Sequence, residues 1–146
     1  MRKIVIIEDN PADAKTLRVA ISRRDPSIEM IVLEDGAQAL DYFSSVMDKG
    51  ESACCDLILL DLNLPHVSGF EVLEFLKANA GLKSLPVVVL SGSSSDEDIA
   101  RCYASGANSY ICKPTGIEQV FQLASQLITY WFDVAKRPKV VSLSVL

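Results

Sequence analysis

The chain has 146 residues and a net charge of −5 at pH 7. This length suits one compact domain, and 49% hydrophobic against 23% charged residues is enough for a core that stays soluble. The acidic balance argues against nucleic-acid binding, which needs a basic patch or stripe. No apolar run approaches the roughly 20 residues that span a bilayer. We therefore expect a cytoplasmic protein that binds neither nucleic acid nor a membrane.

Five short apolar runs recur at regular intervals along the chain. They are rich in Val and Ile and show little alternation between apolar and polar positions. This pattern is typical of strands buried on both faces, and therefore of a parallel sheet covered by helices. The runs are residues 3–7, 30–33, 56–60, 86–90 and 108–111.

Helical spacing and helix-ending residues fill the intervals between these runs. A first helix is predicted from Asn10 and Pro11, a cap followed by proline at the first helical position, with Asp13 as an acid in the first turn. Ser95 opens the fourth helix as a variant of the capping box, and Gly106 closes it. The positions that mark the helix faces are Ala14, Leu17 and Ile21 in the first helix, Ala39 or Leu40, Phe43 and Met47 in the second, and Gly69, Val72, Leu73 and Leu76 in the third, which Gly81 can end.

Alternation of strands and helices predicts an α/β fold with right-handed crossovers. Five strands suit the flavodoxin-like (βα)5 arrangement, a doubly wound parallel sheet of order 2-1-3-4-5. Periodicity alone does not give that strand order. We expect residues 1–135 to form this domain and residues 136–146 to form a C-terminal tail that contributes to a dimer interface.

The residues at the carboxyl ends of the predicted strands form one chemical set. In a parallel sheet these ends lie at one edge, where ligands bind. Three carboxylates held together either shift their pKa values or bind a cation, and oxygen ligands favour a hard divalent ion. A carboxylate beside a metal and an ammonium group can attack phosphorus. The residues are Glu8 and Asp9 after the first strand, Asp61 after the third, Ser91 after the fourth and Lys113 after the fifth.

Each of these residues alone also has an ordinary structural explanation. Acids and serines at strand ends often cap helices, and Lys113 alone would be a surface lysine. Asp61 is harder to explain in this way, because it ends an apolar run where an uncompensated carboxylate is costly. Their joint occurrence at four strand ends therefore favours a functional site.

Four segments carry a resemblance to a known family. They are residues 4–10 (Ile-Val-Ile-Ile-Glu-Asp-Asn), 57–69 (Leu-Ile-Leu-Leu-Asp-Leu-Asn-Leu-Pro-His-Val-Ser-Gly), 87–92 (Val-Val-Val-Leu-Ser-Gly) and 106–114 (Gly-Ala-Asn-Ser-Tyr-Ile-Cys-Lys-Pro). In combination they are highly specific, and from about residue 3 to residue 126 the chain resembles bacterial two-component receiver domains. The resemblance implies a switch that is phosphorylated by a sensor histidine kinase and signals through protein contacts.

The resemblance also implies roles for single residues. Asp61 would be the phosphoacceptor, Lys113 the cation that pairs with the phosphoryl group, and Ser91 the switch hydroxyl. Tyr110 would be the switch aromatic, whose ring turns inward when Ser91 moves; on its own it would be interpreted as a half-buried strand tyrosine.

A metal site and a peptide isomer follow from the same resemblance. Asp9 and Asp61 would bind Mg²⁺ through their carboxylates, Glu8 would act mainly through a bound water, and Asn63 would supply its backbone carbonyl. Pro114 would follow a cis peptide bond, which X-Pro bonds tolerate better than others.

A narrower resemblance rests on residues 8–13 (Glu-Asp-Asn-Pro-Ala-Asp), residues 93–99, residues 106–114 and the late Tyr-Trp-Phe of residues 130–132. These segments are similar to the small response regulators of bacterial phytochromes. The similarity implies a light-sensing kinase as the partner and a dimer formed through the last helix. It leaves the downstream protein open.

The predicted fifth helix, from about Gly116 to about Ala135, carries two apolar stripes. A helix that is apolar on two sides usually contacts something besides its own core, and the alternative is a broad core face with the tail folded over it. The stripe expected in the core is Ile117, Val120, Phe121, Ala124, Ile128 and Trp131. The residues expected in a homodimer interface are Leu123, Leu127, Tyr130, Trp131 and Val134.

Other functions fit the residues less well. A phosphatase of the haloacid-dehalogenase type needs an acid–base aspartate two residues after its nucleophile, where this chain has Asn63, so we expect no enzyme acting on external phosphates. A flavodoxin-like flavin carrier would have Glu8 and Asp9 facing the flavin phosphate. A receiver used only for docking would not need the full residue set. His66 is expected to be a solvated loop side chain, and the four cysteines, Cys54, Cys55, Cys102 and Cys112, to be reduced thiols.

Overall fold

The structure is a computed structural model that describes residues 2–50 and 54–138. Within these residues five strands alternate with five α-helices, and a short π-helix follows the last of them. The elements are β1 (Lys3–Ile7), α1 (Pro11–Arg24), β2 (Glu29–Leu33), α2 (Gly36–Asp48), β3 (Leu57–Leu60), α3 (Gly69–Ala78), β4 (Val87–Ser91), α4 (Asp96–Ala104), β5 (Ser109–Cys112), α5 (Ile117–Ile128) and η1 (Thr129–Val134).

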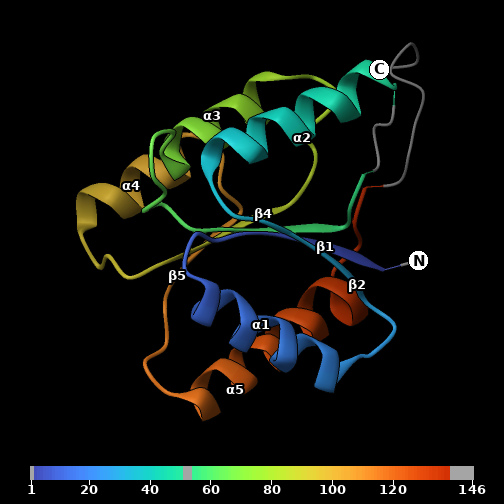
Figure 1. Cartoon of the computed structure of the whole chain (residues 1–146), viewed down its shortest axis with the longest axis vertical. Helices are drawn as coiled ribbons and strands as arrows, with labels where there is room; N and C mark the ends of the chain where they lie inside the picture. The colour runs from blue at the N-terminus through green and yellow to red at the C-terminus, as the bar shows by residue number, and fades with distance from the viewer. Residues whose placement is uncertain (1, 51–53, 139–146) are drawn as a thin grey trace.

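All five strands are parallel, in the order β2-β1-β3-β4-β5. Helices α1 and α5 cover one face of the sheet, and α2, α3 and α4 cover the other (Figure 1). The predicted flavodoxin-like α/β fold and its strand order are confirmed. Ile7 pairs with Leu60 of β3 and with Leu33 of β2, so the carboxyl ends of the three strands lie level with one another.

The core has one hydrophobic cluster on each face of the sheet. The central strands β3 and β4 are buried along their whole length, whereas the edge strands β2 and β5 are partly exposed. Continuous Val, Ile and Leu runs therefore mark the central strands, as expected for strands with helices on both sides.

Most predicted helix ends are confirmed, with one correction in α3. The side chain of Asn10 accepts hydrogen bonds from the amides of Ala12 and Asp13 at the start of α1. The third helix ends at Ala78 and not near Gly81. It ends there because the Asn79 side chain donates to the carbonyl of Phe75 at 2.6 Å and its backbone turns to an extended conformation.

The end of α5 departs from a regular α-helix. Residues Thr129–Val134 form a π-helix, and the amide of Ala135 donates to the carbonyl of Tyr130. Two stripe assignments were wrong. Ile117 is 67% exposed because it lies in the first turn of α5, at the carboxyl edge of the sheet, and Leu127 is 7% exposed and belongs to the core.

No helix among residues 2–50 and 54–138 combines the length and the apolar character needed to cross a bilayer. The predicted tail, residues 136–146, is described only as far as residue 138. There Arg137 donates to the carboxylate of Asp56 at 3.3 Å and to the carbonyl of Trp131 at 2.6 Å, beside the start of β3.

Candidate functional site

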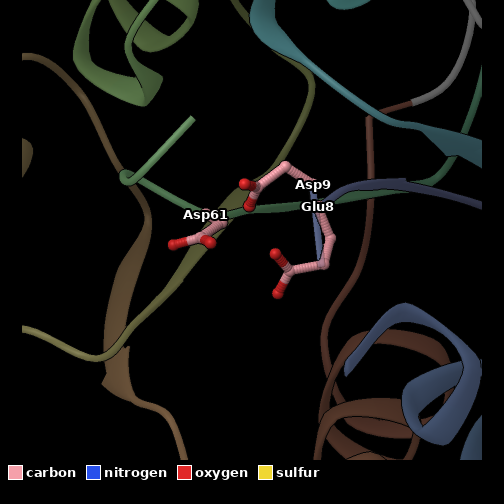
Figure 2. A group of neighbouring side chains, drawn as sticks. All are labelled: Glu8, Asp9 and Asp61. Carbon is pink, nitrogen blue, oxygen red and sulfur yellow. The ribbon is translucent and has the colours of Figure 1, made fainter. Parts of the chain in front are cut away.

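Three carboxylates meet at the carboxyl edge of the sheet, between β1 and β3. Glu8, Asp9 and Asp61 each offer an oxygen, and these oxygens all lie within 4.8 Å of one another (Figure 2). Glu8 and Asp61 are buried, whereas Asp9 is exposed. A donor set made only of oxygens, open to solvent on one side, fits a hard divalent cation that keeps some of its waters. The predicted acidic cluster is therefore confirmed.

Backbone hydrogen bonds of the sheet fix the positions of these acids. The amide of Glu8 donates to the carbonyl of Leu33, and the amide of Asp61 donates to the carbonyl of Ile7, each at 3.0 Å. The start of α3 presses against the same backbone, since a Cβ on Gly69 would lie 2.3 Å from the carbonyl oxygen of Asp61. Only glycine allows this approach, which explains the glycine at that position of the motif.

Lys113 lies opposite the carboxylates, directly after β5. Its Nζ is 2.5 Å from Oε1 of Glu8, 3.1 Å from Oδ2 of Asp61 and 3.2 Å from Oδ2 of Asp13. Its backbone amide donates to the carbonyl of Ser91, which ties β5 to β4 at this edge. One ammonium group therefore faces three carboxylates.

These contacts shift the pKa values of both partners. Burial raises the pKa of Glu8; the hydrogen bond from Lys113 opposes the shift and the carboxylate of Asp61 adds to it, so the pKa rises to about 7. Burial lowers the pKa of Lys113, but the hydrogen bond to Glu8 and the charges of Asp61 and Glu8 outweigh burial and raise it overall. Lys113 is therefore cationic at neutral pH, and Glu8 is within reach of a proton.

The remaining predicted switch residues lie on β4, β5 and the loop after β4. Ser91 is fully buried as the last residue of β4, and its Oγ accepts a hydrogen bond from the amide of Ser93 at 3.2 Å. The Tyr110 hydroxyl donates to the carbonyl of Ser93 at 2.8 Å, and its ring is half-buried against the core. The Ser93 hydroxyl in turn donates to Asp98 of α4 at 2.7 Å. A single loop residue thus joins the buried serine, the tyrosine and α4.

Two predictions around the site have different outcomes. The amide of Asn63 donates to Oδ1 of Asp61 at 3.2 Å, so this backbone lies beside the carboxylate, and its carbonyl as a metal ligand stays a prediction. The predicted cis peptide bond before Pro114 is wrong, because no cis bond occurs in the described parts of the chain. The trans isomer of an X-Pro bond is favoured by about 0.5–1 kcal/mol, and Lys113 reaches all three carboxylates with this bond trans.

Sequence reasoning missed the contact of Asp13 with Lys113, because it treated Asp13 only as an acid in the first turn of α1. The signal that could have found it is position: one helical turn after the Glu-Asp pair, the first turn of α1 returns to the edge where β1 ends.

His66 is an exposed loop residue, as predicted, in the left-handed conformation with φ 66°. Cys54 and Cys55 are buried thiols with sulfur atoms 3.7 Å apart, Cys102 is buried and Cys112 is exposed.

Comparisons with known proteins match this geometry. The response regulator receiver domain model matches residues 4–125. Response regulator Rcp1 of Synechocystis is 32% identical over 92% of this chain and 92% of its own. The crystal structure of the phosphorylated cyanobacterial phytochrome response regulator RcpA superposes with a TM-score of 0.87 at 36% identity, covering 94% of this chain and 99% of that one. A receiver domain from Rhodospirillum rubrum gives a TM-score of 0.84 at 36% identity, covering 94% and 98% of the two chains.

Receiver domains accept a phosphoryl group from histidine kinases and hold a divalent cation in an acidic pocket. The family match covers most of the chain, and the acidic cluster lies where such a pocket is expected. The chain therefore belongs to the response regulator receiver domain family, as its strand order, its cluster of three carboxylates and these matches show.

Proposed function

We propose that this receiver is phosphorylated on Asp61 and that Mg²⁺ is bound beside it by Glu8, Asp9 and Asp61. The observation that carries the proposal is the position of the Lys113 ammonium, which contacts Glu8 and Asp61 at the edge of the three-carboxylate cluster. The divalent cation, when bound, offsets negative charge on the phosphoryl oxygens. The crystal structure of response regulator Rcp1 in its Mn²⁺-bound form supports a divalent ion at this kind of pocket.

The two oxygens of Asp61 have different partners. Oδ2 accepts from Lys113, and Oδ1 accepts from the amide of Asn63. An oxygen of the Asp61 carboxylate attacks phosphorus, the bond from phosphorus to the phosphohistidine nitrogen of the donor kinase breaks, and the imidazole of that histidine leaves. Lys113 exchanges a carboxylate contact for the phosphoryl oxygens. The hydroxyl of Ser91 then donates to the phosphoryl group, and the backbone carbonyl of Asn63 completes the metal site.

Signalling follows from the loop after β4. Because Ser93 bonds to Ser91, Tyr110 and Asp98, movement of Ser91 toward a phosphoryl group changes the position of Tyr110 and of α4. This is a local charge change that biases a two-state element. The output is a reshaped face of α4, β5 and α5 that a downstream protein recognises.

The donor is a sensor histidine kinase, and the similarity to Rcp1 and RcpA favours a phytochrome. A test is phosphotransfer from a purified phytochrome kinase under red and far-red light. Light-dependent labelling of the wild type is expected, and equal labelling under both conditions would remove the light assignment while leaving Asp61 as the acceptor.

The end of α5 and the following η1 supply a surface for a homodimer. Tyr130 is 53% exposed and Val134 64% exposed, while Leu123 and Trp131 are half-buried beside them. Leu127 is left out because it packs inside the domain. In sedimentation velocity we expect a dimer for the wild type and a monomer for Val134→Asp, with Asp41→Asn on α2 as a surface control.

The acceptor is tested by intact mass after incubation with acetyl phosphate and Mg²⁺. We expect one phosphoryl group on the wild type and on the Asp41→Asn control, and none on Asp61→Asn or with EDTA. A folded wild type that gains no mass would favour either a receiver used only for docking or one that accepts a phosphoryl group only from its kinase. Multiple turnover of p-nitrophenyl phosphate would favour a phosphatase. The exposed Asn63 argues against that function, because it stands where such an enzyme needs an acid–base aspartate.

A further inference from the structure

Asp13 is the least buried of the three carboxylates around Lys113. Its side chain is 52% exposed and lies 3.2 Å from Nζ, whereas the side chains of Glu8 and Asp61 are 7% and 6% exposed. It comes from the first turn of α1, which the Asn10 side chain holds by accepting from the amide of Asp13 itself. Its position is therefore set by the start of α1.

Asp13 also stands outside the metal cluster. Among the described residues, Glu8, Asp9 and Asp61 are the carboxylates whose oxygens lie within 4.8 Å of one another. A divalent ion held there offsets the charge of that cluster and leaves the charge of Asp13 uncompensated. Asp13 is then the carboxylate that still attracts Lys113 when the phosphoryl group is present.

The structure also offers space on the Asp13 side of Lys113. A cavity of about 210 Å³ extends from Glu8 and Lys113 along α1 and the start of α5, with Asp13, Thr16 and Thr115 in its lining. The flexible side chain of Lys113 can therefore stay beside Asp13 without displacing packed atoms.

We propose that Asp13 is a positioning residue that acts through Lys113 and competes with the phosphoryl group for its ammonium. It weakens the hold of the site on the phosphoryl group and so limits how fully the switch is occupied. This inference rests on the proposed function. It differs from the ordinary role of an acid in a first helical turn, which stabilises α1 through the helix dipole and has no effect on a ligand of Asp61.

The test is the affinity for beryllofluoride, a phosphoryl analogue, at saturating Mg²⁺, followed by ¹⁹F NMR. Asp13→Asn is expected to bind it about two- to fivefold more tightly, the size expected for loss of a partly exposed ion pair. Asp13→Glu, which keeps the charge, should remain close to wild type. Asp41→Asn, which removes an exposed acid from the opposite face of the sheet, should not change the affinity.

A double-mutant cycle identifies the route. In a Lys113→Gln background the effect of Asp13→Asn should disappear, because the competing pair is already absent. An unchanged or weaker affinity in Asp13→Asn, or the same gain with and without Lys113, would overturn the inference while the proposed function stands. A wild type that binds no beryllofluoride with Mg²⁺ would overturn both.

Discussion

Two partly buried lysines, Lys113 at the carboxyl edge and Lys77 in the last turn of α3, each have three oxygen partners. Lys113 faces carboxylates. Lys77 donates to the carbonyl of Lys83 at 3.0 Å, to the carbonyl of Leu85 at 2.9 Å and to Oδ1 of Asn108 at 3.3 Å. The two ammonium groups thus have the same number of oxygen partners, but those of Lys113 are charged and those of Lys77 are neutral.

The difference appears in the pKa values of the two lysines. Burial lowers the pKa of Lys77, whose partners are neutral, whereas the carboxylates around Lys113 outweigh burial and raise its pKa. Neutral carbonyl groups accept the hydrogen bonds of Lys77 but leave no net negative charge that would attract a further cation. Three carboxylates carry more negative charge than one lysine offsets, so the site at Lys113 can still take up a metal ion. The contacts of Lys77 join the turn after α3 to Asn108, just before β5, whereas the carboxylates around Lys113 belong to the site that we propose for the metal ion and the phosphoryl group.

The largest expected effect on stability comes from removing the ammonium group of Lys77. Lys77→Met removes this donor from three acceptors, of which the carbonyl of Leu85 belongs to a buried residue, and we expect the free energy of unfolding to fall by about 2 kcal/mol. Urea denaturation measures it, with exposed Lys83→Met as the matched control. Mg²⁺ should not restore the loss, and a full restoration would contradict the structural role.

Lys113→Met should show the opposite response to metal. Without the ammonium, Glu8 and Asp61 are uncompensated, and we expect a loss of about 1–2 kcal/mol at pH 8, limited because Glu8 can take up a proton. Saturating Mg²⁺ should stabilise this variant by more than it stabilises the wild type in the same urea experiment. Equal stabilisation of both proteins would contradict a shared charge balance.

Stability should also depend on pH, because the pKa of Glu8 differs between the folded and the unfolded state. The pKa of Glu8 is about 7 in the folded protein against 4.5 ordinarily, so between these values the folded state holds a proton that the unfolded state has lost. Stability from this group therefore falls as pH rises from about 4.5 to about 7. Without Mg²⁺, wild-type stability should fall relative to Glu8→Gln between pH 5 and pH 7.5, and parallel curves would contradict the shifted pKa.

The smallest effect on stability is expected for Asp13. Its ion pair with Lys113 is half exposed, so Asp13→Asn should cost no more than about 0.5 kcal/mol in urea denaturation. A loss of stability as large as that of Lys77→Met would mean that Asp13 stabilises the fold. The contacts of Lys113 would then be structural, like those of Lys77.

The site was largely predictable because it needs only local information. Once the strands are known to be parallel, the residues that follow them share one edge, and this places Glu8, Asp61 and Lys113 together. The strand order came from analogy with the flavodoxin-like arrangement of five strands, since burial of each run says nothing about its neighbours. The contact of Asp13 with Lys113 escaped because it depends on the direction in which α1 leaves the edge.

Other errors came from positions where the local pattern looks ordinary. Lys77 is a common last-turn lysine in sequence, and its partners are 6, 8 and 31 residues away. Gly106, predicted only to close α4, also leaves room for the Lys77 side chain, because a Cβ there would lie 2.9 Å from Cγ of Lys77. Ile117 and Leu127 were misassigned because helical spacing does not show where the sheet beneath α5 ends.

The π-helix at Thr129–Val134 bears on how such chains can diverge. Each turn of a π-helix holds one residue more than the hydrogen-bonding pattern of an α-helix allows, so deleting a single residue between Ile128 and Ala135 would restore a regular α-helix. That deletion would rotate Tyr130 and Val134 about the helix axis relative to α5, while the carboxylates at the other edge of the sheet stayed in place. Because Tyr130 and Val134 belong to the surface that we propose for a homodimer, a single deletion would change that surface and leave the site around Asp61 unchanged.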